Sequence, residues 1–194
     1  SASDVIAVTI TADILAADDN GISTDAAVGN NAALTIAGAL ADGGSVTLSN
    51  ARKVTITSAG DDSGISFTIV GTDINGTAQT ESLTGADTGV ATSSKFFLTI
   101  ASITAVGDPA ANVKAGISAD SSSIVYSGRS RLKGVFLTST ATAGTVDFLN
   151  TSTAGTSLMK ISSVASATAT RDVVIPENGV LFTDGIYIQY TVST

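Results

Sequence analysis

The sequence predicts an all-β fold, with two antiparallel β-sandwich or barrel-like modules and an extended N-terminal arm. Turn signals recur at short intervals, and the runs between them are rich in Val, Ile, Thr and Phe, which is typical of sandwich or barrel strands. No window shows sustained helical periodicity. The turn signals are Asp19-Asn20-Gly21, Asp42-Gly43-Gly44, Asp61-Asp62-Ser63-Gly64, Asn75-Gly76, Glu177-Asn178-Gly179 and Asp184-Gly185.

The composition agrees with this fold class. The 194 residues are 43% hydrophobic but only 5% aromatic, so we expect a core of Val, Ile, Leu and Thr, which suit pleated sheets. A chain of this length is expected to form one domain or two small ones.

The arm is predicted over residues 1–27. It contains one run of alternating polarity and then a polar, Asp-rich loop. Because this run stands apart from the other predicted strands, we expect it to add a strand to the sheet of a neighbouring subunit. The apolar positions that share its face are Ile6, Val8, Ile10, Ala12 and Ile14.

The two modules are predicted over residues 28–120 and 121–194. Ser121-Ser122-Ser123 marks the join, and the second module begins with the strand run Ile124-Val125-Tyr126. The first module has enough strand runs for one sandwich. Beside the hairpin described next, these runs are Leu34–Ile36, Val46–Leu48, Val54–Ile56, Phe96–Ile103 and Val113–Ile117.

A β-hairpin is predicted within the segment ISFTIVGTDINGTAQTESLTG, residues 65–85. A two-residue Asn75-Gly76 loop would mix buried and exposed faces. If Asp73 instead starts a type I turn and Gly76 takes the left-handed bulge position, Thr72 pairs with Ala78. This register places Phe67 opposite Leu83 on one buried face, so it is the register that we predict.

A second hairpin is predicted near the end of the chain. A two-residue Asp184-Gly185 turn would pair Phe182 with Tyr187 and Leu181 with Ile188. Pro176 is expected at the second position of the preceding type I turn, because its φ is fixed and it lacks an N–H group.

Composition excludes several classes of function. The chain has no Cys and no His, which removes disulfides, thiolate metal sites and the commonest general base. A net charge of −8 disfavours binding to nucleic acid and to anionic membranes. No apolar run approaches the length of a membrane helix, and the first residues lack the basic region of a signal peptide. We therefore expect a chain made and kept in a cytoplasm.

Other chemical motifs receive little support, so we predict no enzyme, no cofactor and no resident metal. Ser130 and Lys133 match S-x-x-K, but a strand puts them on opposite faces. Most acidic residues lie in turn signals, where they cap their own backbone, so a glycosidase pair is disfavoured. The clusters at Asp18-Asp19-Asn20 and Asp61-Asp62-Ser63 do not complete a calcium-loop pattern, and whether Ca²⁺ occupies one of them stays open.

A basic stripe is the remaining feature. Arg129, Arg131 and Lys133 alternate, so on a strand they share one face while Leu132 and Phe136 share the other. The stripe is either a solvated face or a contact for an acidic neighbour. The candidate interface residues are Ile6, Val8, Ile10, Arg129, Arg131 and Lys133.

Two blocks of sequence resemble virion structural proteins of tailed bacteriophages, of the type found in marine and cyanobacterial phages. The first block is KVTITSAGDDSGISFTIVGTDINGTAQTESLTG followed by SSKFFLTIASITAVG, within about residues 50–107. The second, within about residues 131–192, is RLKGVFLTSTATAGTVDFLNTSTAGTSLMKI with VVIPENGVLFTDGIYIQYTV.

The resemblance implies a non-enzymatic, self-assembling protein, often a trimer, that is part of a virion assembled in the host cytoplasm. The expected role is capsid decoration (cement) or a place on the head surface, with the major capsid protein or tail proteins as partners. A tail-associated fibre adaptor or baseplate component is the alternative in the same class. A host-glycan-binding module is the alternative from another class.

Overall fold

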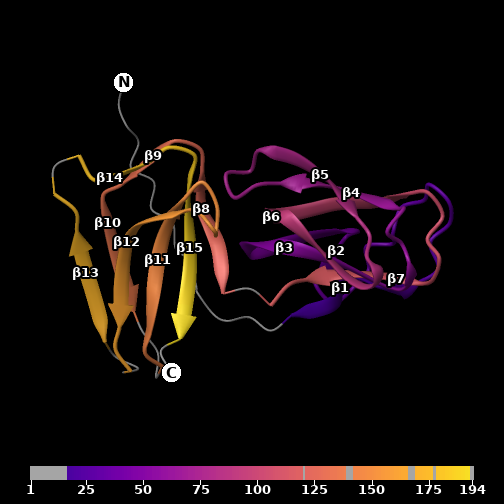
Figure 1. The fold of residues 1–194 in the computed structure, drawn as a ribbon, viewed down its shortest axis with the longest axis horizontal. Helices are drawn as coiled ribbons and strands as arrows, with labels where there is room; N and C mark the ends of the chain where they lie inside the picture. Colours follow the sequence, from indigo (N-terminus) through magenta and orange to yellow (C-terminus); the bar gives the residue numbers. More distant parts are fainter. Residues whose placement is uncertain (1–16, 120, 139–141, 166–168, 177, 193–194) are drawn as a thin grey trace. The chain divides into compact units, whose positions relative to one another are not determined.

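The structure is a computed structural model that describes residues 17–119, 121–138, 142–165, 169–176 and 178–192 (Figure 1). Every regular element among these residues is a β-strand, which confirms the all-β prediction. The contacts divide the chain into two compact units, with the boundary between residues 120 and 121. In this part of the chain there is no helix of the length and apolarity that a membrane crossing would need.

The first module, Ile14–Asp120, is built on one antiparallel sheet. Its strand order is β1-β7-β3-β6-β4-β5, with β2 beside β3. The strands are β1 (Asp18–Ala26), β2 (Ala41–Asp42), β3 (Ser45–Asp61), β4 (Ser66–Thr72), β5 (Ala78–Thr84), β6 (Asp87–Val106) and β7 (Val113–Ile117).

This sheet curls around a single core. Ile22 of β1, at one end of the sheet, and Phe67 of β4, next to the strand at the other end, are fully buried in the same apolar cluster. The ladder between the long strands β3 and β6 contains several register shifts, for example between Thr47 and Arg52. Such irregularities bend strands, and here they let one sheet enclose a core.

The predicted hairpin over residues 65–85 is confirmed. Strands β4 and β5 pair Thr72 with Ala78 and Phe67 with Leu83. In the turn, the Gly76 N–H donates to the Asp73 carbonyl oxygen at 3.0 Å, and Gly76 has a φ of 78°. Asp73 Oδ1 accepts hydrogen bonds from the N–H groups of Asn75 and Thr77, which explains why an aspartate begins this turn.

The start of the first module differs from the prediction. Residues 18–26, expected as the Asp-rich loop of the arm, form β1 and pair with β7. The local turn signal is overridden because Ile22 and Ser23 are buried against the sheet. Leu34 and Ile36, expected in a strand, are buried in the core but lie in an irregular segment. The apolar positions from Ile6 to Ile14 lie outside the described residues.

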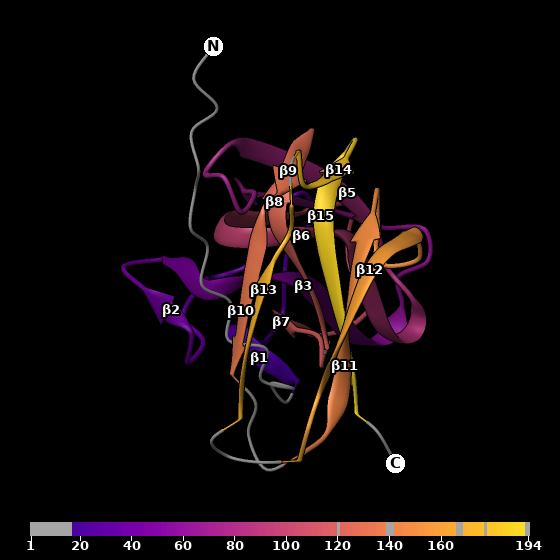
Figure 2. The ribbon, with the colours of Figure 1, turned by 90° about the vertical axis from the view of Figure 1, so that its left-hand side faces the viewer.

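The second module, within Ser121–Thr194, has two layers (Figure 2). One layer is a sheet of strand order β12-β11-β15-β8, and the other is formed by the pairs β10-β13 and β9-β14. The strands are β8 (Ser122–Ser127), β9 (Ser130–Leu132), β10 (Gly134–Thr138), β11 (Gly144–Asn150), β12 (Thr156–Ser163), β13 (Thr170–Val174), β14 (Val180–Phe182) and β15 (Gly185–Val192).

The hairpin predicted at Asp184-Gly185 is wrong. Phe182 pairs with Ser130 in one layer, whereas Tyr187 pairs with Ile124 in the other. The predicted turn would have put Phe182 on the sheet face opposite to that of Ile186 and Ile188. The chain instead passes from one layer to the other, and all three side chains are buried in one core.

Pro176 also occupies a different place from the one expected. Its carbonyl oxygen accepts a hydrogen bond from the Gly179 N–H at 3.2 Å, so Pro176 is the first rather than the second residue of its turn. The turn lies between β13 and β14, where a residue without an N–H group interrupts no ladder.

Candidate interaction surface

The outward face of β10 and β13 carries two exposed apolar side chains, and we call it the exposed ladder face. Phe136 is 68% exposed and Val174 is 77% exposed. Phe136 pairs with Asp172 and Gly134 pairs with Val174, so Phe136 and Val174 are diagonal neighbours on this face. An aromatic side chain can reach a diagonal neighbour, and the missing side chain of Gly134 leaves room for this contact.

The expectation that Phe136 would share a face with Leu132 is wrong, because Leu132 packs against the core and Phe136 is exposed. Strand β9 ends at Leu132 and β10 begins at Gly134, and this break shifts the alternation by one residue. Leu132 is half-buried against the core of the module, but beyond the break Val135 and Leu137 take the inward positions. A Gly that interrupts a strand is the one sequence signal for such a shift.

The basic stripe is less regular than expected. Arg129 lies in the turn after β8, Arg131 lies in β9, and Lys133 lies between β9 and β10; all three are exposed. An Nη1 group of Arg131 donates to the carbonyl oxygen of Asn178 at 3.1 Å. Lys133 directly precedes Gly134, so its backbone lies beside the exposed ladder face.

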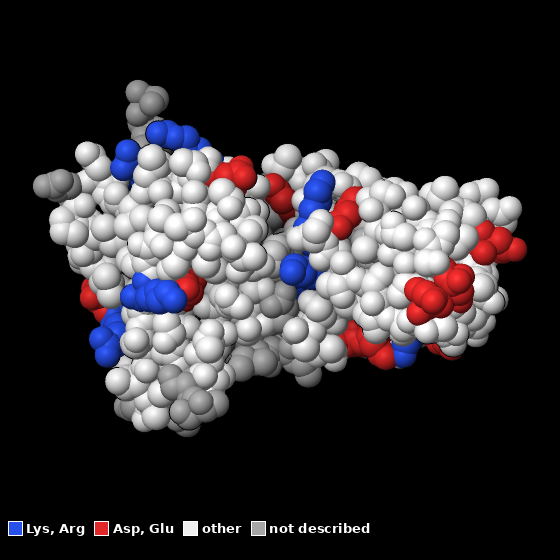
Figure 3. Space-filling model, viewed as in Figure 1, with Lys and Arg blue, Asp and Glu red and all other residues white. Residues whose placement is uncertain are grey.

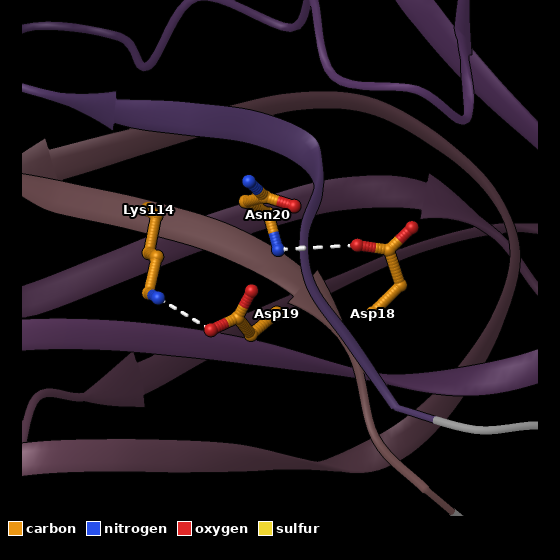
Figure 4. Close-up of polar contacts among 4 residues, drawn as sticks. All are labelled: Asp18, Asp19, Asn20 and Lys114. Carbon is orange, nitrogen blue, oxygen red and sulfur yellow. Dashed lines mark hydrogen bonds and ion pairs between the residues drawn. The ribbon is translucent and has the colours of Figure 1, made fainter.

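The acidic turn at Asp18-Asp19 does not gather its carboxylates (Figure 4). Asp18 Oδ1 accepts a hydrogen bond from the Asn20 N–H at 3.3 Å, whereas Asp19 forms an ion pair with Lys114. The two side chains thus serve a local turn and a contact between β1 and β7. This arrangement offers no shared set of oxygen ligands.

The two carboxylates of Asp61-Asp62 also point to different environments. Asp61 is exposed and accepts hydrogen bonds from Ser63 Oγ and from the Ser63 N–H, which lower its pKa. Asp62 is 1% exposed, and its Oδ1 accepts a hydrogen bond from the Ala110 N–H at 2.8 Å. Among the residues that the structure describes, no group of three or more acidic side chains could hold a metal ion.

A hollow of about 370 Å³ lies on the first module. It is lined by side chains of β1, β3 and β7 and of the segment before β2. Its lining contains no aromatic ring, which is the group that usually provides a stacking platform for a sugar or a base. The lining residues are Asp18, Leu40, Thr47, Leu48, Ser49, Asn50, Arg52 and Ile117.

Charge is sparse on the molecular surface. On the face shown in Figure 3, Lys, Arg, Asp and Glu lie in separate small groups, and uncharged atoms cover most of the area. Against this background the exposed ladder face is distinguished by two adjacent apolar side chains. Comparisons with protein families, with curated proteins and with solved structures find no match for this chain.

Proposed function

We propose that this chain is a structural protein of a tailed-bacteriophage virion, most specifically a capsid decoration or head-surface protein. Two observations support the proposal. The blocks that resemble such proteins, about residues 50–107 and 131–192, lie one in each module. The all-β fold that the resemblance implies is the fold that the chain adopts.

The exposed ladder face carries the proposal, because it gives the protein a surface suited to another subunit. Phe136 and Val174 form an apolar spot in the part of the molecule where Arg131 and Lys133 are also exposed. Adjacent exposed apolar side chains with a polar rim are typical of protein–protein contacts. The partner surface would be apolar at its centre and acidic at its rim, on the major capsid protein or on another copy of the chain.

The amount of this protein in purified particles tests the proposal. Decoration of a capsid requires a copy number comparable to that of the major capsid protein, whereas a tail component is present in far fewer copies. Band intensities from purified virions therefore separate the two roles. Absence of the protein from the particles would overturn both.

Particle attachment tests the exposed ladder face directly. Replacing Phe136 and Val174 with Ser should weaken binding to particles that lack this protein by at least tenfold, because the apolar centre of the contact is lost. The matched control is Val90→Ser, which removes a side chain that is 57% exposed on the first module. Equal loss of binding in the control would show that the effect is not specific to this face.

The basic residues should contribute differently. Replacing Arg129, Arg131 and Lys133 with Ser should weaken attachment at low salt and have little effect at high salt, since ions screen exposed charges. Sedimentation of particles with bound protein over a range of NaCl concentrations measures this. Unchanged binding of the triple variant at low salt would identify the stripe as a solvated face.

A further inference from the structure

Asn-Gly dipeptides occur at three places in the chain, Asn20-Gly21, Asn75-Gly76 and Asn178-Gly179. All three asparagines are exposed. Such a dipeptide can modify itself, because the backbone nitrogen of Gly can reach the side-chain carbonyl carbon of Asn and no side chain on Gly hinders the approach. The three dipeptides differ in the charges that surround the Gly nitrogen.

The self-modification is a deamidation whose only other reactant is water. The Gly N–H loses its proton, and the nitrogen attacks Cγ of the Asn side chain. An N–Cγ bond forms, the bond between Cγ and Nδ2 breaks, and the proton leaves with this nitrogen as ammonia. Water then opens the succinimide ring at one of its two carbonyl groups, which yields Asp or isoaspartate. Because negative charge develops on the Gly nitrogen, a nearby cation speeds the reaction and a nearby carboxylate slows it.

A carboxylate lies beside the Gly nitrogen of Asn75-Gly76. Asp73 Oδ1 accepts hydrogen bonds at 2.9 Å from the N–H groups of Asn75 and Thr77, which flank Gly76 on its two sides. The Gly76 N–H itself donates to the Asp73 carbonyl oxygen at 3.0 Å. Loss of this proton would put negative charge next to the carboxylate, so the charge of Asp73 protects this dipeptide.

A carboxylate also lies beside Asn20-Gly21. Asp18 Oδ1 accepts a hydrogen bond from the Asn20 N–H at 3.3 Å (Figure 4). The other oxygen of this carboxylate lies against Gly21, since a Cβ atom at Gly21 would clash with it. Gly21 is also buried in β1. This dipeptide is therefore protected in the same way, by an Asp two residues before the Asn.

The dipeptide Asn178-Gly179 has cations beside it. Arg131 Nη1 donates to the carbonyl oxygen of Asn178 at 3.1 Å, and this carbonyl belongs to the same peptide group as the Gly179 nitrogen. A guanidinium on the oxygen draws electron density from the nitrogen, so the N–H gives up its proton more readily. The Gly179 N–H donates to an uncharged acceptor, the Pro176 carbonyl oxygen. The side chain of Lys133 lies against Gly179 as well, since a Cβ atom there would be 3.1 Å from Lys133 Cδ.

We propose that Asn178 is a site of spontaneous deamidation and that Arg131 sets its rate. The product places a carboxylate beside Arg131, so the basic stripe loses one unit of positive charge. Isoaspartate also adds one carbon atom to the main chain of the turn between β13 and β14. A virion protein is not renewed after assembly, so the modified fraction would grow with the age of a particle. This consequence rests on the proposed function, but the modification itself does not.

Peptide mass spectrometry tests the modification. The folded protein is incubated at neutral pH in water that carries heavy oxygen and is then digested in ordinary water, so that only deamidation during the incubation gives a heavy product. Conversion of Asn178 should be about tenfold faster than conversion of Asn20 or Asn75 in the same molecules. Equal rates at Asn178 and Asn75 would overturn the proposal.

Two variants test the role of Arg131. Arg131→Gln should slow the conversion of Asn178 about fivefold and leave that of Asn75 unchanged, because the cation is lost. The matched control, Arg129→Gln, removes an exposed cation from the same stripe and should leave Asn178 unaffected. A merely loosened turn would speed the conversion. An unchanged or faster rate in Arg131→Gln, or equal slowing in the control, would therefore overturn the role of Arg131.

The charge of the product is tested separately. Asn178→Asp should weaken attachment to particles at low salt, because it removes positive charge from the basic stripe. Unchanged attachment would contradict the proposed contact of this stripe, whereas equal conversion rates would contradict the modification. The two proposals therefore fail separately.

Discussion

Asp62 joins three segments of the first module. Its backbone N–H donates to Ala86, its backbone carbonyl accepts from Ile65, and its side chain accepts from Ala110. Replacing Asp62 with Ala should lower the free energy of unfolding by about 1–3 kcal/mol, because the Ala110 N–H loses its acceptor. Urea unfolding measures the change. Asp62→Asn keeps an acceptor oxygen and should cost less; equal losses would show that this hydrogen bond is unimportant.

The lowered pKa of Asp61 should give the stability of the first module a small pH dependence. The hydroxyl of Ser63 and then its backbone N–H lower the pKa of Asp61 from 3.8. A carboxyl with a lowered pKa contributes stability above its unfolded-state pKa, and this contribution is lost as the pH falls through the folded-state pKa. Ser63→Ala should raise the pKa of Asp61 toward 3.8, as followed by NMR titration of the side-chain carboxyl. If the pKa of Asp61 were unchanged in this variant, the Ser63 hydroxyl would not be the main cause of the lowered pKa.

At the scale of a single element, Gly116 determines how β1 pairs with β7. A Cβ atom at Gly116 would lie 1.8 Å from the carbonyl oxygen of Asp18, which no side chain can do. Gly116→Ala should therefore displace β1 from the sheet while the β4-β5 hairpin stays intact. Hydrogen exchange should show faster exchange of the β1 amides. The matched control is Gly64→Ala, where a Cβ atom meets open space.

The two predicted hairpins show what a sequence can specify for an element. The β4-β5 hairpin was predictable because Asp73 and Gly76 define its turn within a few residues. The segment around Asp184-Gly185 has an equally good turn signal, but Phe182 and Tyr187 pair with strands that lie far away in the sequence. The turn residues carry no information about such long-range pairings. It is these pairings that place Phe182 and Tyr187 in different layers.

The exposed ladder face was missed for a related reason. Alternation through residues 129–136 predicts Phe136 on the same face as Leu132, and only the break at Lys133 and Gly134 reverses this. Val174 belongs to β13, whose pairing with β10 is a long-range contact. The sequence alone identifies Arg129, Arg131 and Lys133 as candidate interface residues. The apolar centre could not be predicted, because it forms only when β10 pairs with β13.

At the scale of the whole molecule, each module has its own apolar core. Phe67 and Phe182 are fully buried, one in each. Each Phe→Ala variant should lower the stability of its own module by about 3–5 kcal/mol. Hydrogen exchange should show the loss in residues 18–117 for Phe67→Ala and in residues 122–192 for Phe182→Ala. A loss spread equally over both modules would show that they unfold as one unit.

The pairing of β1 with β7 has a consequence for the order of folding. During translation the residues of β1 leave the ribosome well before those of β7, and this partner strand is complete only when Ile117 has been added. Closing so long a loop is slow, and until it closes the Ile22 side chain is exposed to solvent. The hydrogen bonds between β1 and β7 thus form late, and until then the nascent chain is open to aggregation and to chaperones.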